Sequence, residues 1–365
     1  MTTQSTNSDL YFSTARALQA KFAAREISSV EATRGMIDRI YSLEPQLNSF
    51  ITVTPERALK HAEIADQRLR GAGQEPTPLT GVPIMVKDNF STKDVETTAA
   101  SKILKGYIPP YDGTAVQLLK EAGAVILGKG NLDEFAMGSS NETSAFGPVH
   151  NPWDTDRVPG GSSGGAAAAV AAGECFVAFG SDTGGSIRQP ASLCGIVGMK
   201  PTYGLVSRFG LLAFGSSLDQ IGPLTRSVAD TADALNIISS HDRRDSTSVA
   251  APFDDFAKDI DASVAGMNIG VPKEYLVEGI EPGVRSAFEA SLKTLEELGA
   301  NISETSLPLT DHALAVYYII APSEASANLS RYDGVKYGLG SLESSTSAQA
   351  TETARGEGFG DEVKR

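Results

Sequence analysis

One stretch, residues 159–202, constrains the fold of this chain more than any other. It carries two serine clusters flanked by glycine, GGSSGG at 160–165 and DTGGSIR at 182–188. Between them lie an alanine-rich run, 166–172, and a short apolar run, 176–179. Alanine is the strongest helix former, whereas glycine permits unusual backbone angles and lets main-chain N–H groups approach a ligand. The stretch therefore predicts a helix and a strand bracketed by two polar loops, not a flexible linker.

Helix and strand patterns alternate along the rest of the chain. Residues 28–44 start with the capping-box pattern Ser28-x-x-Glu31, and we expect Pro45 to end this helix. The other predicted helices are 8–23, 55–69, 114–122, 282–298 and 311–330, and the other predicted strands are 50–53, 84–86, 124–127, 267–271 and 301–305. Such alternation favours an α/β fold with a mixed central β-sheet covered by helices on both faces.

Composition excludes several classes of protein. No apolar run approaches the roughly 20 residues that span a bilayer, and the first ten residues lack a signal-peptide pattern, which predicts a cytoplasmic protein. The net charge of −14 disfavours broad contact with nucleic acid, whose phosphates are bound mainly by lysine and arginine. The two cysteines, Cys175 and Cys194, are too few for a disulfide framework and are expected to be buried and reduced.

Several common catalytic patterns fit the sequence poorly. Residues 160–164 match G-x-S-x-G, but that motif needs a strand directly before it, and NPWDTDRVP is a poor strand. Neither cysteine has the basic surroundings of a reactive thiol. Residues 123–129 resemble a phosphate-binding loop, yet Gly130 replaces the required hydroxyl residue. A Ser-His-Asp triad with one of the four histidines stays open, because its members meet in space and not in sequence.

A serine with a lysine base fits the sequence better. The predicted strand 84–86 carries Lys87 to its carboxyl end, the edge where α/β folds place their chemistry. The reference pKa of lysine is about 10.4, so Lys87 must be buried before its amine can be neutral and act as a base near pH 7. The end of an apolar strand supplies that burial.

The run from GGSSGG to GMKPT resembles the signature of the amidase signature family, which cleaves carboxamides with a Ser-cisSer-Lys triad. The resemblance implies that Ser186 is the nucleophile, Ser162 the bridging serine in a cis peptide after Gly161, and Lys87 the base. It also implies one amidase signature domain over 1–365. Its expected parts are an N-terminal helical segment at about 1–75, a catalytic core at about 76–230 and a further sheet and helix layer at 231–365.

The family resemblance implies an acyl-transfer mechanism. Lys87 takes a proton through Ser162 from Ser186, which attacks the amide carbon. Asp182 and Arg188 would support the nucleophile loop, or form only an ion pair that fixes a turn. Ser163 is expected to be structural. The oxyanion would be bound by the backbone N–H groups of Thr183, Gly184, Gly185 and Ser186.

Further motifs narrow the resemblance within the family. The segments NLDEFAMGSSNETSAFGPVHNPWD, SEASANLSRYDGVKYG and GEGFGDEVKR are similar to the glutaminase subunits of tRNA-dependent amidotransferases. This resemblance implies hydrolysis of glutamine and transfer of the ammonia to the B subunit of a heterotrimer with B and C subunits. There Glu-tRNA(Gln), and in some organisms Asp-tRNA(Asn), is amidated. ATP and Mg are expected at the partner and no cofactor or metal in this chain, with the tRNA held through the B subunit.

The resemblance also suggests residues that bind glutamine. Tyr317 matches a substrate-contacting tyrosine, although it could equally be a core aromatic of an amphipathic helix. Arg365 is the nearest match to the arginine that binds the α-carboxylate, or it is an exposed terminal charge. Because the family pattern continues further, we expect a chain truncated at its C-terminus. The alternatives are therefore a stand-alone amidase for another carboxamide, or an inactive chain that only binds partners.

Overall fold

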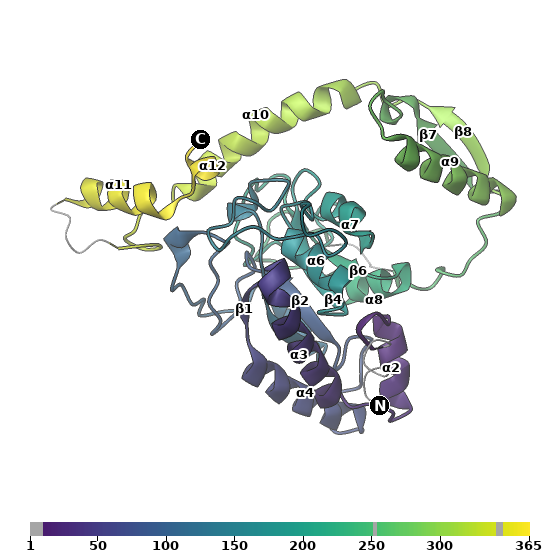
Figure 1. Cartoon of the computed structure of the whole chain (residues 1–365), viewed down its shortest axis with the longest axis horizontal. Coiled ribbons are helices and arrows are strands. Elements are labelled where there is room, and N and C mark those ends of the chain that lie inside the picture. The colour runs from purple at the N-terminus through teal and green to yellow at the C-terminus, as the bar shows by residue number, and fades with distance from the viewer. Residues whose placement is uncertain (1–9, 251–253, 341–345) are drawn as a thin grey trace. The chain divides into compact units, whose positions relative to one another are not determined.

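The computed structural model describes residues 10–250, 254–340 and 346–365 (Figure 1). The chain divides into two compact units, one of Met1–Phe256 with Glu324–Arg365 and one of Ala257–Ser323. Both serine clusters belong to the first unit. The first predicted helix is found as α2, Ala15–Ala23, and residues 8 and 9 of that prediction lie outside the described residues. The organisation as a single domain stays a prediction.

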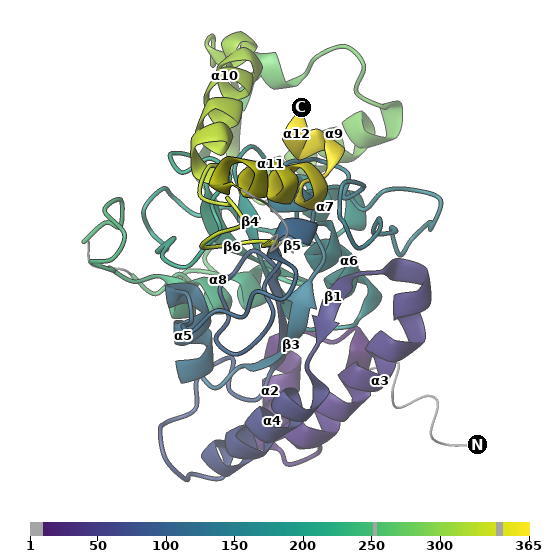
Figure 2. The same ribbon diagram turned by 90° about the vertical axis from the view of Figure 1, so that its left-hand side faces the viewer.

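Six strands form the central sheet of the first unit, in the order β1-β3-β2-β4-β6-β5. Their bounds are β1 Phe50–Val53, β2 Pro83–Lys87, β3 Val125–Gly130, β4 Val177–Asp182, β5 Val197–Gly198 and β6 Gln220–Thr225. β2 pairs in parallel with β3 and β4, whereas β1 runs antiparallel to β3, and β6 runs antiparallel to β4 and β5. The predicted mixed sheet is confirmed, and Figure 2 shows β1 beside β3 at one edge.

Helices cover both faces of this sheet. Every residue of β2, β3, β4 and β6 is buried, and because successive side chains of a strand point to opposite faces, both faces must be covered. α4 packs against β3, α6 against β2 and β4, and α8 against β6. The helices of this unit are α3 Ser29–Leu47, α4 Pro55–Leu69, α5 Thr114–Glu121, α6 Gly164–Ala172, α7 Arg188–Cys194, α8 Val228–Ile238, α11 Ser347–Gly358 and α12 Asp361–Lys364, with short 3-10 turns η1 Lys102–Leu104 and η2 Glu134–Ala136.

The prediction that Pro45 ends the second helix is wrong. α3 continues through Pro45 to Leu47 and is capped by Asn48 in the left-handed conformation, with φ 52°. A proline in the last turn removes only one helical hydrogen bond, the one to the carbonyl of Tyr41. Tyr41 is 56% exposed, so water can bind that carbonyl instead. The capping box is present as predicted, because Ser28 and Glu31 bond each other's backbone amides.

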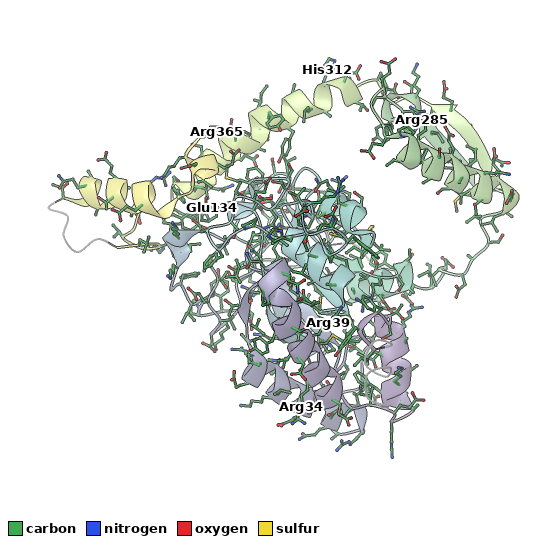
Figure 3. All side chains as sticks on the ribbon, viewed as in Figure 1. Arg34, Arg39, Glu134, Arg285, His312 and Arg365 are labelled. Carbon is green, nitrogen blue, oxygen red and sulfur yellow. The ribbon has the colours of Figure 1, made fainter. Side chains whose placement is uncertain are left out.

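The last part of the chain is fastened to the first unit through Glu134. This side chain is 1% exposed and accepts hydrogen bonds from the Ser101 hydroxyl and from the Gly360 amide, the latter at 2.9 Å. The neighbouring Phe135 ring packs 4.9 Å from Tyr332 and 5.8 Å from Phe359, measured between ring centroids. η2 is also in contact with α12, and Figure 3 labels Glu134 close to this helix. An acidic side chain and an aromatic cluster thus hold this segment in place.

The second unit is a small βαβ arrangement. β7 Asn268–Pro272 and β8 Asn301–Thr305 pair in parallel, and η3 Lys273–Tyr275 and α9 Pro282–Glu297 lie between them in the chain. Both predicted strands and the predicted helix are therefore found. α10, Thr310–Leu329, begins in this unit, and its residues from Glu324 onward belong to the first. No helix within the described ranges has the length and apolar character needed to cross a membrane.

Candidate active site

Lys87 is the last residue of β2 and is fully buried, with an exposed fraction of 0%. Burial lowers the pKa of Lys87 from 10.5 to about 7, because the ammonium loses its hydration. The buried carboxylates of Asp133, Asp182 and Asp219 act in the opposite direction and raise it. The balance leaves an amine that is substantially neutral at physiological pH, as a proton acceptor must be.

Three hydroxyl groups surround the Lys87 amine. Its Nζ lies 2.8 Å from Ser162 Oγ, 2.9 Å from Ser163 Oγ and 3.0 Å from Ser181 Oγ. Ser162 and Ser163 come from the loop before α6, and Ser181 comes from β4, the strand that pairs with β2. The peptide bond between Gly161 and Ser162 is cis, as the family resemblance implies. The structure thus brings together two of the three expected triad residues at hydrogen-bonding distance.

Asp133 holds the Ser162 loop. The Asp133 amide donates to the Ser162 carbonyl at 3.2 Å, and the Asp133 carboxylate accepts hydrogen bonds from the amide of Asn141 and the hydroxyl of Thr143. A Cβ at Gly161 would lie 2.1 Å from Asp133 Oδ2, closer than any side chain can approach. The glycine before Ser162 is therefore required by the crowding around this carboxylate.

Ser186 lies in the loop between β4 and α7. Its carbonyl accepts a hydrogen bond from the Ser163 amide at 3.1 Å, which joins the two serine loops. The Ser186 residue is 7% exposed, whereas Lys87 and Ser162 are 0% exposed. Within the described part of the chain, no side chain is hydrogen-bonded to the Ser186 hydroxyl, so this group is available to a substrate.

Asp182 fixes the loop that carries Ser186. Its carboxylate accepts hydrogen bonds from the amides of Gly185 at 2.9 Å and Ile187 at 3.0 Å, and it is ion-paired with Arg188 at 2.8 Å. Burial alone would raise the pKa of Asp182, but the hydrogen bonds from Arg188 and Ile187 outweigh it and keep the pKa below its usual value. The ion pair with Arg188 therefore has the turn-fixing geometry that the sequence allowed.

The expected oxyanion-binding amides lie in this same loop. Gly185 adopts φ 133°, a conformation that favours glycine, and its amide is already bonded to Asp182. The Thr183 hydroxyl donates to Asp219 Oδ1 at 2.6 Å, and Asp219 also accepts from the backbone amide of Phe214. These contacts anchor the loop at both ends around Gly184.

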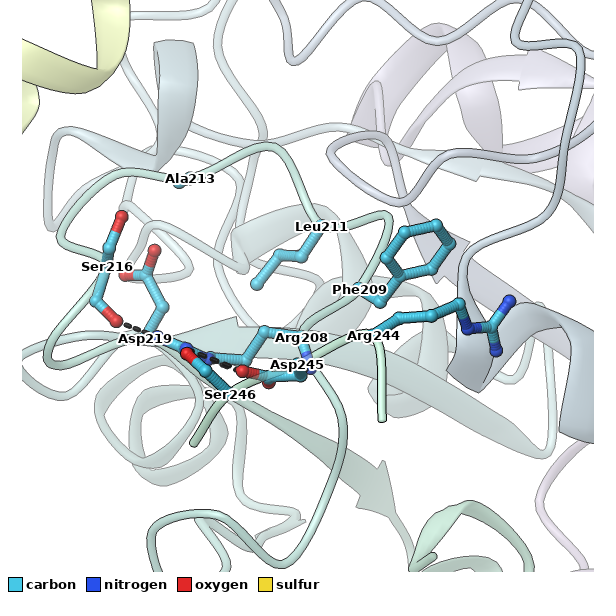
Figure 4. Close-up of a pocket in the computed structure, with 9 residues that line it drawn as sticks. All are labelled: Arg208, Phe209, Leu211, Ala213, Ser216, Asp219, Arg244, Asp245 and Ser246. Carbon is cyan, nitrogen blue, oxygen red and sulfur yellow. Dashed lines mark hydrogen bonds and ion pairs between the residues drawn. The ribbon is translucent and has the colours of Figure 1, made fainter. Parts of the chain in front are cut away.

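A cavity of about 260 Å³ reaches this loop from one side (Figure 4). Asp219 lines the cavity and, as described above, binds the Thr183 hydroxyl. The two cavity arginines are already paired: Arg208 with Asp245 at 2.7 Å, and Arg244 with Asp242 at 2.9 Å. Their charges are therefore neutralised within the protein. The complete lining is Arg208, Phe209, Leu211, Ala213, Ser216, Asp219, Arg244, Asp245 and Ser246.

The structure does not bring Tyr317 and Arg365 to the serine loops. Tyr317 lies on the part of α10 that belongs to the second unit, where its ring packs 5.6 Å from Tyr318. Arg365 has a side chain that is 79% exposed and forms an ion pair with Glu362 at 3.0 Å (Figure 3). Glutamine binding by these two residues stays a prediction.

The competing catalytic patterns find no support in the geometry. Cys175 and Cys194 are buried and free, and burial raises the pKa of both thiols, that of Cys194 to about 12. Lys129 of the apparent phosphate-binding loop is buried in β3 and ion-paired with Asp88 at 3.1 Å. All four histidines lie within the described residues, and none is hydrogen-bonded to the two serine clusters. The base that lies against these serines is Lys87.

Sequence reasoning missed four residues that shape this site. Asn89 donates to Ser181, Asp219 accepts from Thr183, and Gln189 bonds the amide of Gly161. Asp133, described above, is the fourth. The only local signal was the position of Ser181 at the end of a predicted strand, directly before the second serine cluster.

Comparison with known proteins agrees with this geometry. The family described as Amidase matches residues 31–365. The A subunit of glutamyl-tRNA(Gln) amidotransferase from Carboxydothermus hydrogenoformans is 55% identical over 357 residues, which are 98% of this chain and 73% of the relative. Its counterpart from Geobacter sp. strain M21 is also 55% identical, with the same coverage.

Solved structures show the same relationship. The crystal structure of the glutamyl-tRNA(Gln) amidotransferase A subunit from Thermotoga maritima aligns with a TM-score of 0.77 and 46% identity, covering 88% of this chain and 67% of that one. A peptide amidase in complex with the competitive inhibitor chymostatin aligns with a TM-score of 0.84 and 33% identity, covering 96% of this chain and 74% of that one. The family match, the close relatives and the geometry of Lys87 and Ser162 agree: the chain belongs to the amidase signature family.

Proposed function

We propose that this chain is the glutaminase subunit, the A chain type, of a glutamyl-tRNA(Gln) amidotransferase. The observation that carries the proposal is the 2.8 Å contact between the buried Lys87 amine and Ser162 in a chain that shares 55% of its residues with named A subunits. The reaction is hydrolysis of glutamine to glutamate and ammonia. The ammonia then serves the amidation of Glu-tRNA(Gln), or also Asp-tRNA(Asn), on a partner protein.

The chemistry proceeds through an acyl-enzyme. Neutral Lys87 accepts a proton from Ser162, which in turn accepts one from Ser186 as its Oγ attacks the amide carbon of glutamine. The C–N bond then breaks and the relay returns the proton to the leaving group, which departs as ammonia. A water molecule attacks the glutamyl ester with help from the same base and releases glutamate. Ser186 suits the first step, because it is the least buried of the three residues.

The negative oxygen of the tetrahedral intermediate needs hydrogen-bond donors. In the structure the Gly185 amide is bonded to Asp182, so the amides of Thr183, Gly184 and Ser186 are the candidates, with Gly185 joining only if that bond opens. Arg188 acts through Asp182, which keeps the loop in shape. Substrate contacts by Tyr317 and Arg365 complete the proposed site.

Partners supply the rest of the reaction. We place ATP, Mg and the tRNA on the B subunit of a cytoplasmic heterotrimer with B and C subunits, and no cofactor in this chain. The net charge of −14 supports this division, because a strongly acidic chain is poorly suited to bind tRNA itself.

A stand-alone amidase is the second candidate, favoured by the TM-score of 0.84 with a peptide amidase. Ammonia release from glutamine, measured for the purified chain with and without the B and C subunits, separates the two. We expect release that depends on the partners and is absent from Ser186→Ala. Hydrolysis of other carboxamides without partners would favour the stand-alone amidase. Binding of the partners with no release above Ser186→Ala would favour an inactive, partner-binding chain.

A further inference from the structure

The Lys87 amine has more hydroxyl partners than a neutral amine can treat alike. A neutral amine carries two N–H bonds and one lone pair, whereas three hydroxyls lie within 3.0 Å of Nζ. Two of them must accept hydrogen bonds from Lys87, and the third must donate its own hydrogen to the lone pair. Catalysis through Ser162 requires that the third is Ser162.

The direction of the Ser163 contact follows from counting hydrogens. Ser163 Oγ donates to the carbonyl oxygen of Ser181 at 3.1 Å. A hydroxyl group has one hydrogen, so Ser163 can only accept from Lys87. Ser163 and Ser181 are 0% and 2% exposed, so solvent offers no alternative partner to either. One N–H of the amine is therefore committed to Ser163.

Ser181 is placed to take the second N–H. Its Oγ already accepts a hydrogen bond from Nδ2 of Asn89 at 3.0 Å, and Asn89 is 1% exposed. The hydroxyl has two lone pairs, so it can accept from Asn89 and Lys87 together. Ser181 lies on β4 and Asn89 follows shortly after β2, so two paired strands of the sheet hold this donor and acceptor pair in place.

We propose that Ser163 and Ser181 are positioning residues that accept the two N–H bonds of neutral Lys87 and so direct its lone pair at Ser162. The inference rests on the Lys87 relay of the proposed function and adds the residues that orient it. Protonation of Lys87 then reverses only the contact with Ser162, because the ammonium donates to the same two acceptors. The base gains and loses its proton with little movement of its surroundings. Ser163, expected from sequence to be structural, thus has a role in the chemistry.

The test measures the reactivity of Ser186 without relying on glutamine. A serine-directed fluorophosphonate labels Ser186, and the labelling rate is followed from pH 5 to pH 9.5 for the parent, Ser163→Ala and Ser181→Ala. We expect each variant to show a maximal rate at least tenfold below the parent. We also expect its acid limb at lower pH, because an ammonium with one acceptor fewer is less stable and Lys87 loses its proton more readily.

Controls separate positioning from folding. Ser181→Thr keeps the hydroxyl and should restore the acid limb of the parent. Ser192→Ala removes a hydroxyl that bonds only the Gln189 carbonyl in α7, and should match the parent throughout. If Ser181→Ala does not fold, as judged by thermal melting, Ser163→Ala decides, because it lies in a loop and not in a strand. A lower rate with an unmoved acid limb in the folded variants would overturn the inference.

Glutamine hydrolysis by the same set of proteins keeps the two proposals apart. A parent enzyme that labels at Ser186 with the expected pH limb but releases no ammonia, even with the B and C subunits, contradicts only the glutaminase proposal. A parent enzyme that releases ammonia, combined with variants whose acid limbs coincide with its own, contradicts only the positioning role of Ser163 and Ser181.

Discussion

The side-chain oxygen of Gln189 accepts a hydrogen bond from the Gly161 amide at 2.9 Å. Gln189 lies in α7, directly after the Ser186 loop, and Gly161 is the first residue of the cis peptide that presents Ser162. The Gln189 Nε2 group also donates to the Ser139 carbonyl at 2.9 Å. One side chain therefore fixes the bridging serine relative to the nucleophile.

Replacing Gln189 with alanine should lower kcat for ammonia release about tenfold to a hundredfold, since small displacements of reacting groups carry such costs. KM should change little. Gln189→Glu keeps the acceptor for Gly161 but cannot donate to Ser139, so its kcat should fall between the two. Steady-state kinetics test this order. Equal activity of all three proteins would mean that other contacts hold the two loops.

Lys87→Ala and Ser186→Ala should each abolish ammonia release, by about three orders of magnitude or more, because the members of a catalytic unit fail together. The double variant should lose no more than either single variant. Circular dichroism would show whether the fold is kept. Turnover near that of the parent in either folded variant would contradict the assignment of base and nucleophile.

Activity should depend on a group that titrates near pH 7. Burial lowers the pKa of Lys87 to about 7, and only its neutral form accepts a proton. We therefore expect kcat/KM to fall about tenfold per pH unit below this value and to level off above it. A profile of kcat/KM from pH 5 to pH 9 measures the limb. A limb near pH 10, where an exposed lysine titrates, would show that Lys87 is not the base.

The same burial makes stability depend on pH. The pKa of Lys87 falls from 10.5 in the unfolded chain to about 7 in the folded protein, so the unfolded state binds the extra proton between these values. The free energy of unfolding should therefore rise with pH across this window, by about 1.4 kcal/mol per unit from this one group. Lys87→Met should lack this contribution. Urea unfolding of both proteins at pH 7.5 and pH 9.5 gives the difference, and parallel pH dependences would contradict it.

Gly161→Ala should prevent correct folding of the site, because the added Cβ would lie 2.1 Å from the Asp133 carboxylate. We expect loss of activity and a free energy of unfolding lower by about 1–3 kcal/mol or more, as for other overpacked sites. Gly356→Ala is a matched control in α11, where an added Cβ meets nothing within 4 Å. That change should stabilise the protein by about 0.5–1 kcal/mol. Thermal melts of both variants test the contrast.

The sequence predicted the parts of the site that depend on one segment at a time. Lys87 could be placed at a strand end because Ile84, Met85 and Val86 form an apolar run, and both serine loops could be recognised by their glycines. Ser162, Ser186 and the cis peptide followed from the family resemblance and not from residue patterns. The α/β class followed from the alternation of helices and strands.

What could not be predicted depends on contacts between distant segments. Asn89 and Ser181 are separated by 92 positions, and Thr183 and Asp219 by 36, so no local pattern links them. The same holds for the antiparallel edge strand β1, whose pairing with β3 depends on how the whole sheet assembles. Pro45 was misjudged because its effect depends on the distance to the helix end, which the proline itself does not determine.

Asp133 and Glu134 are adjacent in the chain but serve different parts of the protein. Asp133 holds the loop of Ser162, whereas Glu134 binds the amide of Gly360. Removing the segment around Gly360 would leave the Glu134 carboxylate buried without that donor, one residue from the carboxylate that shapes the catalytic loop. Trimming or displacing the final helix would therefore be felt at the amide-cleaving serines, although no side chain of that helix has to reach them.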